Sequence, residues 1–133
     1  MRYLLDTNIL IAALKQNEAV LARMELVAVS DLILSPVVLG ELETGVQKSR
    51  WQEQNRFRLD TVIAELPQEP LNAGTSVEYG RLRAALEKGG VPIGANDLWI
   101  AAQALQLGAI LVTDNLGEFS RVTGLVIENW LRG

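Results

Sequence analysis

Four acidic residues of this 133-residue chain border its most apolar segments. Each follows or precedes a run of Leu, Ile, Val or Trp; they are Asp6, Glu41, Asp97 and Asp114. A carboxylate beside a hydrophobic core costs several kcal/mol unless something pairs with it. Four such acids from distant segments therefore indicate one site built for a cation, and the sequence predicts a metal-dependent enzyme.

The composition narrows the chemistry of this site. The chain has no His and no Cys, which excludes imidazole acid–base catalysis, thiol nucleophiles, disulfides and zinc sites with Cys or His ligands. Carboxylate oxygens suit Mg²⁺, with Mn²⁺ as a possible substitute. Such ions polarise a phosphoryl oxygen, lower the pKa of a bound water and stabilise the leaving oxygen. The site therefore predicts phosphodiester hydrolysis.

Each acid also has a structural interpretation. Asp6 could cap a helix, Asp97 could favour the dipole of a first helical turn, and Asp114 could belong to an ordinary turn. Glu41 has no such local role, because it lies in mid-helix on the same stripe as apolar residues. The remaining acids that we considered are interpreted as structural or solvent-facing: Asp31, Glu43, Glu69, Glu118 and Glu128.

Polar residues next to the four acids could orient them by hydrogen bonds, although caps and turns use the same residue types. These neighbours are Thr7, Asn8, Asn96 and Thr113. A second segment is both basic and aromatic, and could hold a nucleic-acid backbone and stack a base. The alternative is a solvated helix face with two aromatic residues in the core. The segment comprises Lys48, Arg50, Trp51, Arg56 and Phe57.

The elements that must position the acids follow from the hydrophobic periodicity. Short buried strands are predicted over 2–6, 32–34, 109–112 and 125–127. Helices are predicted from a cap at 7–8, over 20–28, from 35–36, over 51–66, over about 74–88 and after 92–94. This alternation predicts one α/β domain over 1–133, with a central, mostly parallel sheet flanked by helices. Ligands bind outside the carboxyl ends of such strands, and there we expect the acids to meet.

The charge balance does not exclude a nucleic-acid substrate. The formal net charge is -4, yet with the four clustered acids set aside the remaining acids equal the Lys and Arg residues in number. An acid interrupts the first apolar run after three residues, which argues against a signal peptide. No apolar run reaches the ~20 residues of a membrane span. We therefore expect a cytoplasmic protein with no membrane contact.

Four segments resemble the PIN-domain ribonucleases: 5–8 (Leu-Asp-Thr-Asn), 36–42, 93–102 and 111–115 (Leu-Val-Thr-Asp-Asn). The stretch 118–130 looks like that of the VapC toxins of bacterial toxin–antitoxin pairs. The resemblance implies a PIN-like fold and an endoribonuclease, dependent on Mg²⁺ or Mn²⁺, that cuts single-stranded or looped RNA, with transfer RNA as the first expectation. It also implies a homodimer, possible higher toxin–antitoxin complexes, and silencing by a VapB-type antitoxin that binds beside the helices over 36–66.

By position, the resemblance makes Asp6, Glu41, Asp97 and Asp114 the metal ligands and catalytic residues. Many relatives have Asn at the position of Asp114, so its direct ligation is the least secure of the four.

Two other functions are compatible with parts of the pattern. A phosphohydrolase with Asp6 as nucleophile would need a second acid where Asn8 stands and a lysine beyond Lys88, which the chain lacks. A protein-binding module without chemistry has no reason to keep four mutually repelling acids. Nucleotide-binding folds are less compatible still, because neither G-x-G-x-x-G nor G-x-x-x-x-G-K-[ST] occurs.

Overall fold

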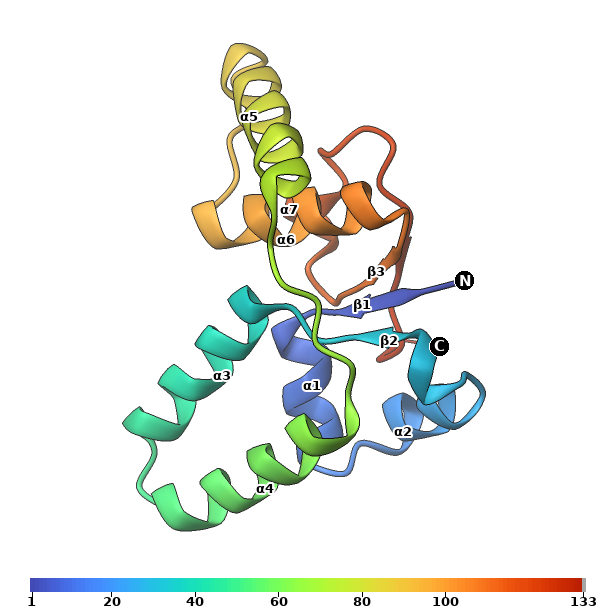
Figure 1. Cartoon of the computed structure of the whole chain (residues 1–133), viewed down its shortest axis with the longest axis vertical. Coiled ribbons are helices and arrows are strands. Elements are labelled where there is room, and N and C mark those ends of the chain that lie inside the picture. The colour runs from blue at the N-terminus through green and yellow to red at the C-terminus, as the bar shows by residue number, and fades with distance from the viewer. Residues whose placement is uncertain (133) are drawn as a thin grey trace.

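The computed structural model describes residues 1–132, and these contain a four-stranded sheet between two helical layers (Figure 1). The strand order is β2-β1-β3-β4, and every neighbouring pair is parallel. The strands are β1 (Tyr3–Leu5), β2 (Leu32–Ile33), β3 (Ile110–Val112) and β4 (Ile127–Glu128). The prediction of an α/β fold with a parallel sheet is confirmed.

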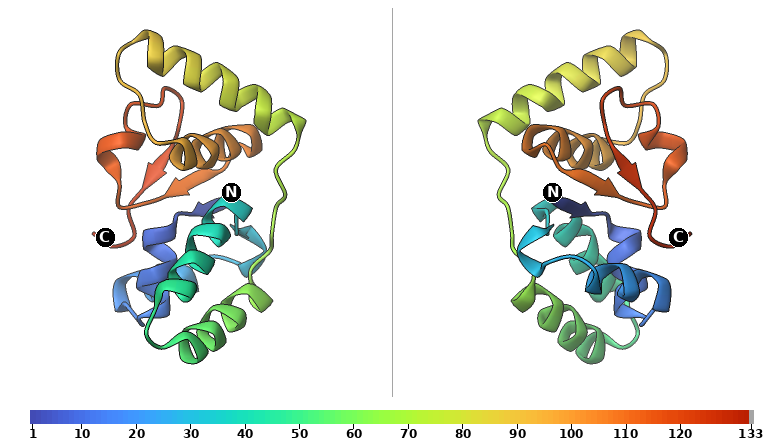
Figure 2. Two further views of the ribbon diagram at one scale, coloured as in Figure 1. Left: turned by 90° about the vertical axis from the view of Figure 1, so that its left-hand side faces the viewer. Right: turned by 90° about the vertical axis from the view of Figure 1, so that its right-hand side faces the viewer.

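The helices cover both faces of this sheet. Figure 2 shows α6 beside the sheet with α5 stacked outside it, while α1, α2, α3 and α4 lie on the other side. The helices are α1 (Thr7–Leu14), α2 (Glu18–Glu25), α3 (Pro36–Lys48), α4 (Gln52–Glu65), α5 (Ala73–Lys88), α6 (Ala95–Leu107) and α7 (Leu116–Phe119), and a 3-10 turn, η1, spans Val29–Asp31.

The central strand β1 lacks polar side chains between its ends, because helices enclose the sheet on both faces. Leu4 pairs in register with Ile33 on β2 and with Leu111 on β3, and all three are fully buried. Strands buried on both faces lose the alternation of apolar and polar residues. The first polar residue after β1 is Asp6, so the acid marks the edge where the strand leaves the core.

Several predicted boundaries differ from the structure. Asp6, rather than 7–8, is the N-cap of α1. The last strand forms at Ile127–Glu128 instead of 125–127, because Gly124 has a φ of 85° and the Leu125 N–H donates to Val122 in a turn. The helix α7 was not predicted from the periodicity, because at four residues it is too short to show one.

Of the two interpretations of the basic, aromatic segment, the one that places Trp51 and Phe57 in the core is wrong. Trp51 is the N-cap of α4 and is 64% exposed, and Phe57 is 74% exposed. Both lie on the α3–α4 hairpin, which projects from the body of the molecule (Figure 1). In the part of the chain that the structure describes, α4 packs on the core through the buried Leu59 and the half-buried Val62 and Ile63.

Candidate active site

Asp6 lies where the chain turns from β1 into α1. Its backbone N–H donates to the Val112 carbonyl on β3 at 2.9 Å, which holds the residue at the edge of the sheet. Its side chain accepts two hydrogen bonds, from the Thr7 N–H at 2.8 Å and from the Thr113 hydroxyl at 2.7 Å. Burial raises the pKa of Asp6, the two hydrogen bonds oppose this, and the negative charge of Glu41 adds to it.

Glu41 reaches the same edge from α3. This helix begins at Ser35, whose hydroxyl accepts from the Val37 N–H at 3.2 Å, and continues with a proline in its first turn. One turn on, Glu41 is half-buried, and its Oε1 accepts a hydrogen bond of 2.6 Å from the Thr7 hydroxyl. Thr7 therefore joins the start of α1 to α3 and fixes the direction of the Glu41 carboxylate.

Asp97 lies in the first turn of α6 and contacts an acid that sequence reasoning placed elsewhere. The pKa of Asp97 is raised to about 7, first by burial of the carboxyl, then by a hydrogen bond with Glu118 and by the negative charges of Glu118, Asp6 and Glu41. The same contact with Asp97 lowers the pKa of Glu118. When the pair carries one proton, Asp97 holds it and donates it in a hydrogen bond to the Glu118 carboxylate.

Glu118 is therefore a site residue, and its interpretation as structural or solvent-facing is wrong. Asn115 supports the pair, because its side-chain N–H lies 3.5 Å from Asp97 Oδ2 and 3.3 Å from Glu118 Oε2. Asn115 is also the N-cap of α7 and accepts from the Glu118 N–H. An Asn followed three residues later by Glu is a recognisable helix start. That signal could have placed Glu118 in a first turn directly after β3.

The carboxylate of Asp114 faces the other way. Its Oδ1 accepts from the Asn129 side chain at 2.7 Å and from Arg132 at 3.2 Å, and these contacts lower the pKa of Asp114. Its backbone N–H donates to the Asn8 side chain at 3.2 Å. The structure thus brings Asp6, Glu41, Asp97 and Glu118 together, and ties Asp114 to the C-terminal segment at the rim.

The four polar neighbours have different contacts. Thr7 and Thr113 donate directly to Glu41 and Asp6, whereas Asn8 contacts the Asp114 backbone. Asn96 is exposed, and within residues 1–132 it has no hydrogen bond to a carboxylate. Three of the acids that were interpreted as structural or solvent-facing form ion pairs away from the site: Glu69 with Arg2, Glu128 with Arg23 and Glu43 with Arg56.

Known proteins are similar to this chain in sequence and fold, over nearly the whole length of both chains. Residues 3–125 match the PIN domain family. Ribonuclease VapC2 of Rickettsia felis is 42% identical over 132 residues, which are 98% of each chain. The chain belongs to the PIN-domain family, among the VapC ribonucleases. The tRNA(fMet)-specific endonuclease VapC of Shigella flexneri is 33% identical over 98% of both chains.

Solved structures of VapC proteins agree with this assignment. In the crystal structure of VapBC2 from Rickettsia felis bound to a DNA fragment from its promoter, one chain superposes with a TM-score of 0.92 at 40% identity, covering 98% of this chain and 99% of that one. The resemblance noted in the sequence is therefore confirmed for family and fold.

In this VapC-family chain the donor atoms at the acid site have the chemistry that suits a hard divalent cation. Within residues 1–132, no group of three acidic side chains is arranged so as to hold a metal ion. All the converging side chains offer carboxylate oxygens, which Mg²⁺ and Mn²⁺ prefer. Burial and mutual repulsion raise the pKa of Asp6 and of Asp97, and a cation would remove that repulsion.

The contacts of Glu118 and Asp114 predict unequal effects of replacing them. We expect Glu118→Gln to lower RNA cleavage about tenfold or more, because its carboxylate faces Asp97, and Asp114→Asn to change cleavage by less than about threefold. Initial rates on one RNA under identical metal concentrations measure the difference. A larger loss for Asp114→Asn would instead support its predicted role as a direct ligand.

Proposed function

We propose that this chain is a Mg²⁺-dependent endoribonuclease that cuts transfer RNA and acts as the toxin of a toxin–antitoxin pair. The observation that carries the proposal is the convergence of Asp6, Glu41 and Asp97 from three distant segments at one edge of the sheet, with mutual charge repulsion that raises the pKa of Asp97. One relative is named a tRNA(fMet)-specific endonuclease, which supports transfer RNA as the class of substrate.

In this proposal Asp6, Glu41 and Asp97 hold the cation, with Glu118 beside them, and direct ligation by Asp114 stays a prediction. When bound, Mg²⁺ or Mn²⁺ supplies an activated water and stabilises negative charge on the phosphate. The protein's own hydroxyl groups orient the carboxylates. Thr7 and Thr113 hold the directions of Glu41 and Asp6. Without a cation, protonated Asp97 donates a hydrogen bond to Glu118, and a bound cation would displace that proton.

The residue at position 8 disfavours the phosphohydrolase alternative. Both oxygens of Asp6 accept one hydrogen bond, from Thr7 and from Thr113, and these contacts do not separate a nucleophile from a metal ligand. Asn8, where such a site would need a second acid, points its side chain to the Asp114 backbone. A metal-binding role is compatible with these contacts, because each carboxylate oxygen has a second lone pair.

Free cations on the α3–α4 hairpin are suited to an RNA backbone. Arg56 is not one of these free cations, because it is ion-paired with Glu43 and Asp60. Lys48 and Arg50 have no ion pair among the described residues, and Trp51 between the helices is exposed and able to stack on a base. We include Lys48, Arg50 and Trp51 in the proposed RNA contact, and we propose the exposed Phe57 as a contact of the antitoxin.

The proposed partner is a VapB-type antitoxin, and we also propose a homodimer that can join a larger toxin–antitoxin complex. Structures of relatives contain VapC with VapB, which supports the pairing.

No helix among the described residues has the length and apolar character to cross a membrane. We propose that the protein acts in the cytoplasm, where transfer RNA is found.

Incubation of the purified chain, free of any partner, with total transfer RNA tests the proposed reaction. Discrete fragments should form with Mg²⁺ or Mn²⁺ and should disappear with chelator. Mapping the fragment ends identifies the cleaved transfer RNA. Cleavage that persists in chelator, or that Asp6→Asn leaves unchanged, would show that another site or a contaminant is responsible.

A further inference from the structure

The acids of the candidate site repel the phosphates of an RNA strand. A divalent cation among them would offset only part of that repulsion, so basic side chains near the site must help to hold the strand. Half of the twelve Lys and Arg side chains are already neutralised by ion pairs with carboxylates. Among the residues that the structure describes, the cations without an ion pair are Lys15, Lys48, Arg50, Arg58, Lys88 and Arg121.

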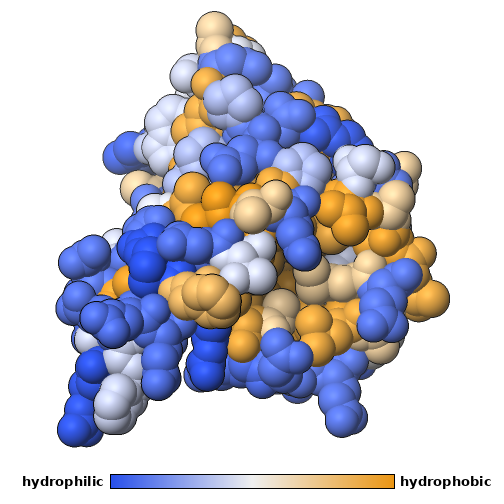
Figure 3. Space-filling model, turned by 60° about the horizontal axis from the view of Figure 1, so that its bottom comes forward, coloured by the Kyte–Doolittle hydropathy of each residue, from blue (hydrophilic) through white to orange (hydrophobic). Residues whose placement is uncertain are grey.

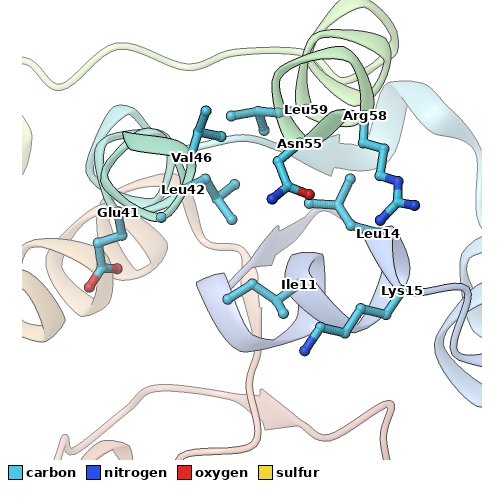
Figure 4. Close-up of a pocket in the computed structure, with 10 residues that line it drawn as sticks. Ile11, Leu14, Lys15, Glu41, Leu42, Val46, Asn55, Arg58 and Leu59 are labelled. Atoms are coloured by element: carbon cyan, nitrogen blue, oxygen red, sulfur yellow. The ribbon is translucent and has the colours of Figure 1, made fainter. Parts of the chain in front are cut away.

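Two of these cations line a hollow away from the acids. Lys15 and Arg58 belong to the lining of a hollow of about 260 Å³ between α1, α3 and α4. Glu41 stands at the edge of this hollow, and its carboxylate points away from it (Figure 4). Lys15 and Arg58 therefore face the hollow rather than the acid site.

Three further cations lie at a distance from the acids. Lys48 is in the last turn of α3, roughly 10 Å along the helix axis from Glu41, and Arg50 follows it. Figure 3 shows mostly hydrophilic residues over the side where α3 and α4 project. Lys88 is in the last turn of α5, which ends at the top of the molecule, away from the sheet (Figure 1). These cations can contact RNA only at some distance from the cut.

Arg121 differs from the other unpaired cations because it adjoins an acid of the site. It lies in the turn that follows α7, and its backbone N–H donates to the Glu118 carbonyl at 3.1 Å. Phe119 and Val122 are buried on either side of this turn and fix it to the core. The pKa of Glu118 is lowered first by its hydrogen bond with Asp97, and the positive charge of Arg121 contributes in the same direction.

The guanidinium of Arg121 is held in place beside the start of α6. Its Nη1 donates to the Pro92 carbonyl at 2.9 Å. Pro92 belongs to the segment that leads into α6, and the N-cap of that helix, Gly94, hydrogen-bonds through its backbone to Glu118. Arg121 is exposed, and its other side-chain N–H groups have no hydrogen-bond partner within residues 1–132. A planar guanidinium fixed in this way keeps N–H donors for two oxygens of one phosphate.

We propose that Arg121 binds the RNA phosphate next to the one that is cut, and thereby positions the strand across the acids. The inference rests on the proposed function, because it names a substrate-positioning residue for that reaction. Glu118, rather than Arg121, contacts Asp97, so the guanidinium reaches a phosphate beside the cut one. Such a contact holds the ground state and the transition state alike, so its loss raises KM more than it lowers kcat.

Binding of a fluorescein-labelled, single-stranded RNA of about ten nucleotides tests the contact. Fluorescence polarisation with Ca²⁺ in place of Mg²⁺ gives the Kd at several salt concentrations. Arg121→Ala should raise the Kd about tenfold, and the plot of log Kd against log salt concentration should become less steep by about 0.7, because one phosphate contact is lost. Arg121→Lys should keep the slope, since the charge remains. Lys88→Ala is the matched control, because it removes an exposed, unpaired cation at the end of α5 and should change neither quantity.

Methylphosphonate substitution identifies the phosphate, because it removes the negative charge of one linkage at a time. In steady-state cleavage with Mg²⁺, Arg121→Ala should raise KM about tenfold and change kcat by less than about threefold. At one linkage beside the cut, methylphosphonate should raise the KM of the unmodified chain by a similar factor. The same substitution should have no further effect on Arg121→Ala, since the two changes remove the same contact.

An unchanged salt slope in Arg121→Ala overturns the inference, as do losses that add at every linkage, and Arg121 then only supports the segment before α6. A higher Mg²⁺ requirement with unchanged RNA affinity also overturns it, because Arg121 then acts on the acids alone. If the unmodified chain binds RNA but cleaves none with Mg²⁺ or Mn²⁺, the proposed function fails, while the salt slope still decides whether Arg121 contacts phosphate.

Discussion

Replacing Asp97 by Asn should lower RNA cleavage about a thousandfold and at the same time stabilise the metal-free protein near neutral pH. Cleavage falls because, in the proposed reaction, Asp97 holds the cation together with Asp6 and Glu41, and an amide is a weaker ligand than a carboxylate. Stability rises because the same repulsion and the burial of a carboxylate disappear with the charge. A change that removes activity but strengthens the fold separates a functional acid from a structural one.

Single-turnover cleavage and thermal unfolding in chelator measure the two effects. Asp31→Asn is the control, because it makes the same chemical change in η1, before β2 and therefore at the opposite edge of the sheet. We expect this control to change cleavage little. If Asp97→Asn cleaved RNA at the original rate, Asp97 would be only a first-turn carboxylate that favours the helix dipole.

Without divalent metal, the thermal stability of the protein should fall as pH rises between about 4 and about 7. The pKa of Asp97 is about 7 in the folded chain, whereas an Asp without contacts has a pKa of 3.8. The folded state therefore holds the proton of the Asp97 carboxyl more tightly than the unfolded state does. The resulting stabilisation is fully present below the unfolded pKa and is lost as pH rises through the folded one. The raised pKa of Asp6 acts in the same direction.

Divalent metal should reverse this loss, with a larger gain in unfolding temperature at pH 8 than at pH 5. A cation binds only the ionised acids, and ligands that bind the folded state stabilise it. At pH 5 the Asp97 proton competes with the metal. Unfolding temperatures in chelator, Mg²⁺ and Mn²⁺ across this pH range measure the effect, and Asp97→Asn should flatten the pH dependence. An equal gain at both pH values would mean that metal binds away from these acids.

Acids whose pKa is lowered in the folded chain make the protein less stable as pH falls, the opposite of the effect of Asp97. Glu43 and Asp114 are held ionised by Arg56 and by Asn129 with Arg132. The stability from these contacts is present above the unfolded pKa values and is lost as pH falls through the folded ones. The metal-free protein should therefore be most stable in the weakly acidic range, between the two effects.

The sequence by itself determined the fold class and the edge of the sheet at which chemistry is possible. Strands such as β1 are short apolar runs, and where each run ends a polar residue must leave the core. Asp6 and Asp97 were predicted for this reason, because strand ends and helix starts follow from local chain chemistry. Glu41 was predicted because its helical stripe is otherwise apolar.

Only the tertiary structure decided which carboxylates face one another. Asp114 and Glu118 lie within one short segment after β3, yet the first turns to Asn129 and Arg132 and the second to Asp97. Likewise the exposure of Trp51 and Phe57 depends on the α3–α4 hairpin having no further layer over it among the described residues. Side-chain direction and layer coverage are set by contacts between segments far apart in the chain, and no local pattern of residue types contains that information.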